Sequence, residues 1–251
     1  MSLLQVENLT RCFGGLVAVN DVTFGVAEGS ITAVIGPNGA GKTTLFNMIS
    51  GFMPPSAGRV MFGAESLAGL LAHQVAARGV VRTFQLVRPF PAMSIAENVC
   101  VGAHLRSKGG VLSALLGQAD QERRIAAEAR CLLDRVGLSG LGDRLPASLG
   151  YGQLRLLEIA RAMAARPRLL LLDEPAAGLN HVETDRLAGL VRSLHADGMT
   201  VLLIEHDMRL VMDLAQHVIV LDFGRKIAEG PPATMANDKA VLDAYLGGVD
   251  A

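Results

Sequence analysis

Four short apolar segments, each closed by polar residues, constrain the fold of this chain more than any other feature of its sequence. They are ITAVIG (31–36), LLLLDE (169–174), TVLLIEHD (200–207) and HVIVLD (217–222). Their apolar residues are continuous, whereas a strand with one face in water alternates apolar and polar residues. Segments with helical spacing, such as 43–51 and 183–196, lie between them. The sequence therefore predicts an α/β fold whose sheet is mostly parallel and buried on both faces.

The segments outside this core have other patterns. Near the N-terminus, LLQVENLT and VNDVTFGV alternate apolar and polar residues, which is typical of a small antiparallel sheet. Between 87 and 165 the pattern is helical, since ERRIAAEARCLLDRVG repeats apolar residues every three or four positions before Gly137. The repeating residues are Ile125, Ala129, Leu132, Leu133 and Val136. We expect one domain over 1–251, with a core of 1–86 and 166–251 and an inserted helical subdomain of 87–165.

Two further segments carry weaker signals. SKGGVLSALLGQADQE (107–122) mixes small, apolar and polar residues, so we expect a flexible or loosely helical connection. The C-terminal DKAVLDAYL predicts a short helix with Val241, Leu242, Tyr245 and Leu246 on one face.

Composition excludes several classes of protein. The net charge is −1, which leaves no basic footprint for nucleic acid, and we expect no nucleic-acid partner. No apolar run approaches the roughly 18–20 residues that span a bilayer, and the N-terminal MSLLQVENLTRCFGG lacks the apolar centre of a signal peptide. Three cysteines, Cys12, Cys100 and Cys131, form no short metal-type pair and favour a reducing, cytosolic setting. The hydrophobic residues still make up 50% of the chain, so we expect them in buried strands and on partner-covered surfaces.

The turn after the first apolar segment fits the G-x-x-x-x-G-K-[ST] pattern of a phosphate-binding loop. This P-loop consists of Gly36, Pro37, Asn38, Gly39, Ala40, Gly41, Lys42, Thr43 and Thr44. Glycine suits it because the backbone N–H groups must turn inward at positive φ, and the following helix adds its dipole. Lys42 would reach the β and γ phosphates, and the Thr43 hydroxyl would bind Mg²⁺. We predict an ATP and Mg²⁺ site; the alternative is a glycine-rich turn without a ligand.

The segment LLLLDEP adds two carboxylates at the end of a buried strand, where parallel sheets place their ligands. Asp173 would hold Mg²⁺ through its water shell, and Glu174 would polarise the attacking water. Adjacent strand residues project to opposite sides, so one carboxylate can serve the metal and the other the nucleophile. The alternative, that both residues cap the next helix, does not account for the P-loop. Nucleotide hydrolysis is the leading hypothesis.

These motifs, together with LGYGQ (149–153), resemble the nucleotide-binding subunits of ABC transporters over essentially the whole chain. The markers occur in that family's order: Phe13, the P-loop, Gln85, the signature loop 149–153, Asp173 and Glu174, the AGLN loop 177–180, and His206. The resemblance implies a dimer in which two subunits pack head to tail. The P-loop of one subunit and the signature loop of the other would enclose each ATP. In this chain, Gly150, Tyr151, Gly152 and Gln153 would present backbone N–H groups to the γ-phosphate, with a helix beginning near Leu154.

The signature loop departs from the family at Gly150, where most members have the serine of LSGGQ. This chain lacks that hydroxyl, and a hydrogen bond to a charged partner is worth about 1.5–3 kcal/mol. We therefore predict weaker engagement of the ATP that this loop encloses. Tyr151 replaces the family's first glycine, as it does in branched-chain amino acid importers.

Three other residues take roles only from the resemblance. Phe13 resembles the aromatic that stacks on adenine, although a core or turn phenylalanine is the alternative. Gln85 resembles the loop glutamine that reaches Mg²⁺ and the water and senses the membrane partner, or it is an ordinary surface residue. His206 resembles the histidine that contacts the γ-phosphate. Asn180 and His181 stand where aspartate and proline are common, which leaves communication between the two ATP sites open.

Finer features are similar to the larger ATPase subunit of branched-chain amino acid importers. They include RTFQLVRPFPAMSIAENV, DEPAAGLN and the ending AVLDAYLG. Leu86 follows Gln85 here, whereas glutamate is common at that place in the smaller subunit and in the lipopolysaccharide-export ATPase. Alternatives are that export-type ATPase, a soluble non-transport ABC ATPase, and a regulatory ATP-binding protein that hydrolyses poorly. The transported solute is left open, because a binding protein and permeases choose it.

The resemblance also implies partners and a place in the cell. Permease subunits would dock in a groove near 86–95, lined by Val87, Pro89, Phe90, Pro91, Met93 and Ile95; alternatively these residues close the core of the helical subdomain. A second ABC ATPase subunit would complete the dimer, and we favour a heterodimer over a homodimer. The protein would lie at the cytoplasmic face of the membrane, as a peripheral subunit.

Overall fold

The computed structural model describes residues 2–85, 87–104 and 118–246. In chain order its elements are β1 (Ser2–Phe13), β2 (Leu16–Ala27), β3 (Ile31–Ile35), α1 (Lys42–Ile49), β4 (Ala57–Phe62), β5 (Glu65–Ser66), α2 (Ala72–Ala77), β6 (Val80–Arg82), α3 (Ile95–Ala103), α4 (Gln118–Arg135), a 3₁₀ turn (Pro146–Ser148), α5 (Tyr151–Ala164), β7 (Leu169–Asp173), α6 (His181–Ala196), β8 (Thr200–Ile204), α7 (Met208–Leu214), β9 (His217–Asp222), β10 (Arg225–Gly230), α8 (Pro232–Met235) and α9 (Lys239–Leu246). Leu86 and residues 107–117 of the expected connection lie outside the described residues, whereas 118–122 form the first turns of α4.

A six-stranded sheet forms the centre of the molecule, in the order β10-β9-β3-β8-β7-β6. Strands β9, β3, β8, β7 and β6 are parallel, and only β10 pairs antiparallel, with β9. All five residues in each of β3, β7 and β8 are buried, as continuous apolar runs require. This arrangement confirms the predicted α/β fold with a mostly parallel sheet.

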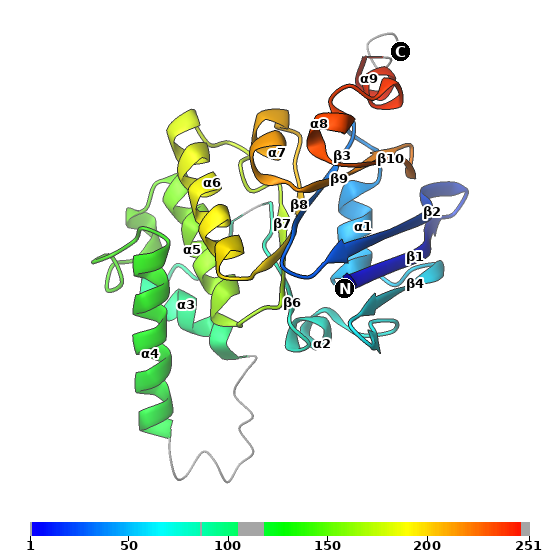
Figure 1. Ribbon diagram of the computed structural model, residues 1–251. Helices are drawn as coiled ribbons and strands as arrows, with labels where there is room; N and C mark the ends of the chain where they lie inside the picture. The colour runs from blue at the N-terminus through cyan, green and yellow to red at the C-terminus, as the bar shows by residue number, and fades with distance from the viewer. Residues whose placement is uncertain (1, 86, 105–117, 247–251) are drawn as a thin grey trace.

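The N-terminal segments form a second sheet, four-stranded and antiparallel, in the order β2-β1-β4-β5. It lies beside α1 and the edge strand β10 (Figure 1). Its inward residues, such as Leu4, Val6 and Val22, share one core with α1 and one face of the central sheet. The alternating pattern of the sequence therefore predicted the right kind of sheet, because only one of its faces is buried.

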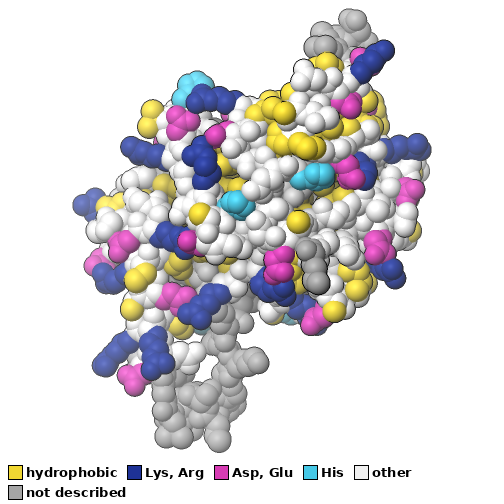
Figure 2. Space-filling model, viewed as in Figure 1, with side chains coloured by type: hydrophobic (Ala, Val, Ile, Leu, Met, Phe, Trp, Pro, Cys, Tyr) yellow, Lys and Arg dark blue, Asp and Glu magenta, His cyan; other side chains and the backbone are white. Residues whose placement is uncertain are grey.

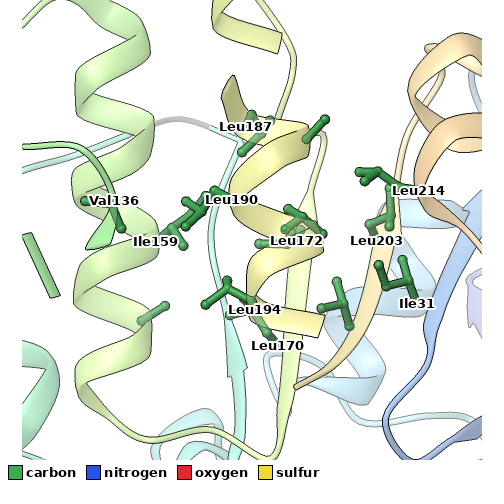
Figure 3. Close-up of a cluster of buried hydrophobic side chains, with 14 of the residues drawn as sticks. Ile31, Val136, Ile159, Leu170, Leu172, Leu187, Leu190, Leu194, Leu203 and Leu214 are labelled. Atoms are coloured by element: carbon green, nitrogen blue, oxygen red, sulfur yellow. The ribbon is translucent and has the colours of Figure 1, made fainter. Parts of the chain in front are cut away.

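Helices α3, α4 and α5 stand between β6 and β7 in the chain and pack together on one side of the molecule (Figure 1). In Figure 3, Ile159 of α5 and Leu187, Leu190 and Leu194 of α6 meet Leu172 of β7 in one apolar layer. The described residues of 87–165 contain no strand. The exact bounds of a helical subdomain stay a prediction.

One local expectation was wrong and another was confirmed. The signature helix α5 begins at Tyr151, with Gly150 as its N-cap, and not near Leu154. Glycine at the N-cap and a glutamine that closes the first turn let the helix start inside the motif. The short C-terminal helix was predicted correctly as α9, on which Val241 is buried and Leu242 is exposed.

Candidate active site

The P-loop connects β3 to α1 and is shaped by glycines that no other residue could replace without strain. Gly36 has φ +150°, and a Cβ there would lie 2.1 Å from the carbonyl oxygen of Leu221. Gly41 has φ +96°, and its Cβ would lie 2.5 Å from the carbonyl oxygen of Ala18. Helix α1 begins directly afterwards at Lys42, so its free N–H groups face the loop. The backbone thus forms the expected anion-binding turn.

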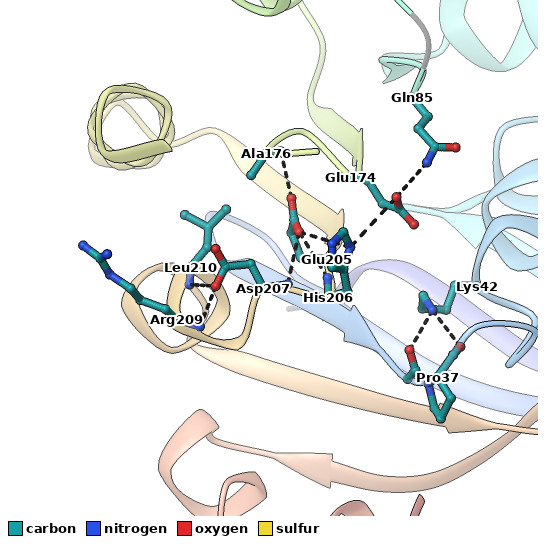
Figure 4. A network of polar contacts seen from close by, with 11 residues as sticks. Pro37, Lys42, Gln85, Glu174, Ala176, Glu205, His206, Asp207, Arg209 and Leu210 are labelled. Carbon is teal, nitrogen blue, oxygen red and sulfur yellow. Dashed lines mark hydrogen bonds and ion pairs between the residues drawn. The ribbon is translucent and has the colours of Figure 1, made fainter. Parts of the chain in front are cut away.

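Lys42 is buried beneath this loop. Its ammonium donates hydrogen bonds to the carbonyl oxygens of Gly36 at 2.7 Å and Pro37 at 2.9 Å (Figure 4). Burial lowers the pKa of Lys42, while the carboxylates of Glu174 and Asp173 oppose that shift. The cation is therefore held at the loop by backbone acceptors and two nearby anions.

Glu174 lies between two residues that come from distant parts of the chain. Its Oε2 accepts a hydrogen bond from Gln85 Nε2 at 2.8 Å and lies 4.0 Å from His206 Nδ1 (Figure 4). The Glu174 backbone has φ +44°, and its N–H donates to the carbonyl oxygen of Ile204. A non-glycine residue at positive φ costs energy and is common at functional sites. The structure thus brings Gln85 and His206, which only the family resemblance had assigned to the site, into contact with Glu174.

Asp173, at the end of β7, forms a buried ion pair that sequence reasoning missed. Arg82 Nη2 lies 2.6 Å from Asp173 Oδ2, and both side chains are almost fully enclosed. The same guanidinium donates to Asn47 Oδ1 at 2.7 Å and lies over the rings of Phe46, Phe52 and Phe84. Arg82 is the last residue of β6, which pairs parallel with β7, so the two side chains meet across neighbouring strands, a contact that no sequence motif signals.

The side chains near the P-loop fit Mg²⁺. Among the described residues, no three His, Cys, Asp or Glu side chains gather closely enough to hold a metal ion by themselves. Thr43, Asp173 and Gln85 instead line one hollow and supply hydroxyl, carboxylate and amide oxygens. Mg²⁺ prefers a few oxygen ligands of this kind and keeps waters and substrate phosphates as the rest.

Glu205, beside His206, is a second buried carboxylate that sequence reasoning missed. Its side chain is 0% exposed, and it accepts hydrogen bonds from the backbone N–H groups of Ala176, His206 and Asp207 (Figure 4). Burial raises its pKa, and these hydrogen bonds oppose the shift. It ties the segment after Glu174 to the segment that carries His206.

The signature residues occupy the first turn of α5. The backbone N–H of Gly150 donates to Gln153 Oε1 at 3.1 Å, and the first intrahelical hydrogen bond runs from Leu154 N–H to the Gly150 carbonyl. The N–H groups of Tyr151, Gly152 and Gln153 therefore have no intrahelical acceptor. In the described part of the chain, these four residues do not line the hollow over the P-loop. The structure does not bring the two phosphate-type loops of one chain together.

Tyr151 and Gly152 contact the AGLN loop and the helix after it. A Cβ at Gly178, which has φ +77°, would lie 3.0 Å from the Tyr151 ring, and a Cβ at Gly152 would lie 2.5 Å from the Glu183 carboxylate. Asn180 is the N-cap of α6 and forms a reciprocal capping box with Glu183. Asparagine at this position thus has a structural use that is independent of any second site.

Two buried side chains of α5 hold the segment before Gln85. Arg155 donates to the carbonyl oxygen of Phe84 at 2.8 Å, and Glu158 Oε1 accepts the Phe84 N–H at 2.9 Å. The two side chains are 3% and 4% exposed and lie 3.6 Å apart. Arg155 also donates to the Tyr151 hydroxyl at 3.1 Å. The backbone next to Gln85 is therefore anchored to the helix that begins with the signature residues.

Phe13, at the end of β1, is 42% exposed. The Arg11 guanidinium lies 4.8 Å from its ring centre. Phe13 is not among the described residues that line the hollow over the P-loop. That hollow, of about 350 Å³, is lined by Asn38, Gly39, Ala40, Gly41, Lys42, Thr43, Thr44 and Glu174 and, unexpectedly, by Leu16, Val17, Ala18 and Phe223.

A larger groove of about 740 Å³ extends from Thr43 and Gln85 to Arg88, Phe90 and Arg161. Phe90 and Met93 are exposed, as expected for the segment near 86–95, and Arg161 lies over the Phe90 ring. Ile95, however, is fully buried as the first residue of α3, so its assignment to an exposed groove was wrong. The apolar spacing of α3 required it in the core.

On the face shown in Figure 2, cationic and anionic side chains are interspersed. No helix of the described residues is both long enough and apolar enough to cross a membrane.

Comparisons with known proteins identify the family. A family model described as ABC transporter matches residues 19–177, and one described as branched-chain amino acid ATP-binding cassette transporter matches residues 225–251. The chain is 45% identical over 249 residues to the high-affinity branched-chain amino acid transport ATP-binding protein BraF of Pseudomonas aeruginosa, covering 98% of each protein. It is 44% identical to LivG of Escherichia coli K12, a protein with the same description, again over 98% of each.

A solved structure agrees with this assignment. The ADP conformation of MJ1267, an ATP-binding cassette of an ABC transporter, superposes with a TM-score of 0.87 at 33% identity and covers 98% of this chain and 99% of that one. A shared fold alone would not define the site, but residues 19–177, which the ABC transporter family model matches, include the P-loop, Glu174 and the signature helix. The chain therefore belongs to the ABC transporter family, as one of its ATP-binding cassettes.

Proposed function

We propose that this chain is the ATP-hydrolysing subunit of an importer for branched-chain amino acids or a related small solute. The observation that carries the proposal is the Glu174 carboxylate, which lies beside the P-loop hollow with Gln85 and His206 in contact. The names of the relatives BraF and LivG support this solute class. They also favour import over the lipopolysaccharide-export type and over non-transport ABC ATPases.

In this mechanism the P-loop amides and Lys42 bind the phosphates of ATP. Thr43, Asp173 and Gln85 would hold Mg²⁺, which would neutralise negative charge on those phosphates. Glu174 accepts a proton from the attacking water as a general base. Gln85, hydrogen-bonded to Glu174, orients its carboxylate and the water, and His206 contacts the γ-phosphate. Phe13 stacks on adenine.

We further propose that the working unit is a dimer in which the first turn of α5 completes the partner's site. The free N–H groups of Tyr151, Gly152 and Gln153 support this role, since a helix N-terminus attracts phosphate. Gly150 has no side chain to add a hydrogen bond, so the site completed by a partner with serine would be the stronger. This asymmetry favours a heterodimer with a second ABC ATPase subunit. Permeases would dock near Phe90 and Met93, which places the subunit at the cytoplasmic face of the membrane.

The substitution Glu174→Gln tests the proposal because it removes the base and leaves the phosphate site intact. We expect ATP hydrolysis to fall by about 10²- to 10⁴-fold while ATP binding persists. Glu65→Gln, at an exposed carboxylate on β5, is the matched control. Sedimentation of Glu174→Gln with ATP should then show a trapped dimer, either alone or only after mixing with the smaller ATPase subunit. Hydrolysis at the wild-type rate in Glu174→Gln would refute the assigned base.

A further inference from the structure

Among the described residues, Phe223 is the most exposed large apolar side chain. It lies in the turn between β9 and β10, with its side chain 86% exposed and its backbone at φ +42°. A bulky residue at positive φ is a conformational outlier, and such strain concentrates at functional sites. The turn has glycine at the next position, yet the exposed position is a phenylalanine.

The backbone of this turn is fixed against the P-loop. The N–H of Gly224 donates to the carbonyl oxygen of Ala40 at 3.1 Å, and the N–H of Asn20 donates to the carbonyl oxygen of Gly224 at 2.7 Å. A Cβ at Gly224 would lie 2.7 Å from the carbonyl oxygen of Ala18, so the turn touches β2 as well. The backbone of Phe223 is therefore held beside the phosphate-binding loop, and its side chain lines the hollow over that loop.

The hollow over the P-loop has two chemically different sides. The P-loop follows β3, the central strand of this part of the sheet. Glu174 follows β7, on the β8 side of β3, and contributes an acidic wall. Phe223 follows β9, on the other side of β3, where it lines the hollow with Leu16 and Val17. All three apolar side chains are exposed although they face a polar loop.

We infer that Phe223, with Leu16 and Val17, forms an apolar wall that binds the nucleobase of the bound nucleotide. The inference rests on the proposed function and extends it to this turn. With the phosphates on the P-loop amides, the apolar side of this hollow offers a flat aromatic base a surface of matching polarity next to the loop. Aromatic rings stack on nucleobases regardless of sequence, because every base has a π-face. Phe223 would add to Phe13, whose ring already has Arg11 over it.

Affinity measurements test the wall directly. Wild-type protein, Phe223→Ala and Phe223→Tyr are titrated by calorimetry with ATP and with inorganic tripolyphosphate, which has no base. We expect Phe223→Ala to weaken ATP binding by at least about fivefold, Phe223→Tyr to restore it, and tripolyphosphate binding to be equal in all three. Equal ATP affinity in wild type and Phe223→Ala would overturn the inference and leave the proposed function standing. If wild type binds neither ligand, the proposed function fails, and the inference with it.

A fluorescence experiment distinguishes the base from a second copy of the chain. The sequence contains no tryptophan, so Phe223→Trp creates a single reporter. Leu242→Trp, at an exposed residue of α9 outside the hollow, is the control. We expect ATP, but not tripolyphosphate, to change the emission of Phe223→Trp at the same nucleotide concentration whatever the protein concentration. A change that tripolyphosphate also produces, or one that requires high protein concentration, would assign Phe223 to another contact and overturn the inference.

Discussion

The P-loop and the Phe84–Gln85 segment lie on two sides of the same site, but they are held in place by different means. Backbone atoms shape the P-loop: its glycines approach the carbonyl oxygens of Leu221 and Ala18 too closely for any Cβ. Side chains hold the Phe84–Gln85 segment, since Arg155 donates a hydrogen bond to the carbonyl oxygen of Phe84 and Glu158 accepts one from its N–H. The motif residues of the first arrangement lie within nine positions of the sequence, although the carbonyl groups that they approach are distant. The second requires residues more than 70 positions apart to meet.

This difference decides how each region responds to change. A backbone-shaped loop fails when a side chain is added, because steric overlap and a left-handed φ are local costs. A segment held by buried charges fails when a side chain is removed, because the remaining charge loses its partner. The predictions below compare the two regions, beginning with the largest expected effect.

The first prediction removes one buried charge. Arg155→Met should lower the free energy of unfolding by roughly 3–5 kcal/mol, because Glu158 is left enclosed and keeps only the more distant Arg161 as a cation. Urea denaturation followed by circular dichroism measures the loss. The double variant Arg155→Met/Glu158→Met should recover part of it, since no unpaired charge remains. A loss below about 1 kcal/mol in the single variant would show that the pair does not hold this segment.

The second prediction adds a methyl group to the P-loop at two places. Gly39 and Gly41 both have positive φ, but only Gly41 has backbone within reach of a Cβ, whereas nothing lies within 4 Å at Gly39. Gly41→Ala should therefore cost about 1–3 kcal/mol more stability than Gly39→Ala, because it adds overpacking to the same kind of strain. Thermal unfolding of the two variants measures the difference. Equal melting temperatures would contradict the close approach at Ala18.

The third prediction concerns how the free energy of unfolding depends on pH. The pKa of Glu205 is raised by burial, so the native protein binds this proton more tightly than the unfolded chain does. Stability from this group is complete below the unfolded pKa and is lost as pH rises through the folded pKa. Glu205→Gln should remove that decline, so the difference in unfolding free energy from wild type should vary with pH. His206, whose Nδ1 lies 3.9 Å away, also faces this carboxylate.

The double variant Glu205→Gln/His206→Gln separates the two groups. A pH-dependent difference in unfolding free energy between His206→Gln and this double variant would assign the effect to Glu205, and a difference that does not change with pH would contradict the prediction. Urea denaturation at several pH values between 4 and 8 supplies the measurement.

Much of the fold was predictable because its patterns are local. Continuous apolar runs identified β3, β7, β8 and β9, and alternation identified the N-terminal sheet. The errors occurred at boundaries. The start of α5 depended on a cap at Gly150, and the burial of Ile95 depended on which face of α3 meets its neighbours. Apolar spacing predicts that a face is buried, but it does not say where a helix begins or which marginal residue stays exposed.

The site residues differ in the same way, because some follow from local sequence patterns and others do not. The P-loop, Asp173 and Glu174 were visible in sequence because their chemistry demands certain residue types at strict spacing. Gln85 and His206 entered only through resemblance, and the structure brings both to Glu174. No sequence motif assigned Arg82, Glu205 or Phe223 to the site. An arginine beside an aspartate across two parallel strands leaves no periodic signal in the chain.

The sequence by itself determined the strands of the central sheet, the loop between β3 and α1, and the carboxylates at the end of β7. Each of these depends on residues that are neighbours in the chain, so steric limits and hydrophobic periodicity are enough to specify them. Only the tertiary structure decided three contacts. Helix α5 hydrogen-bonds to the backbone of Phe84, Arg82 forms an ion pair with Asp173, and Phe223 lines the hollow over the P-loop. Those contacts depend on strand order and helix packing, which place residues from distant segments at the same edge of one sheet.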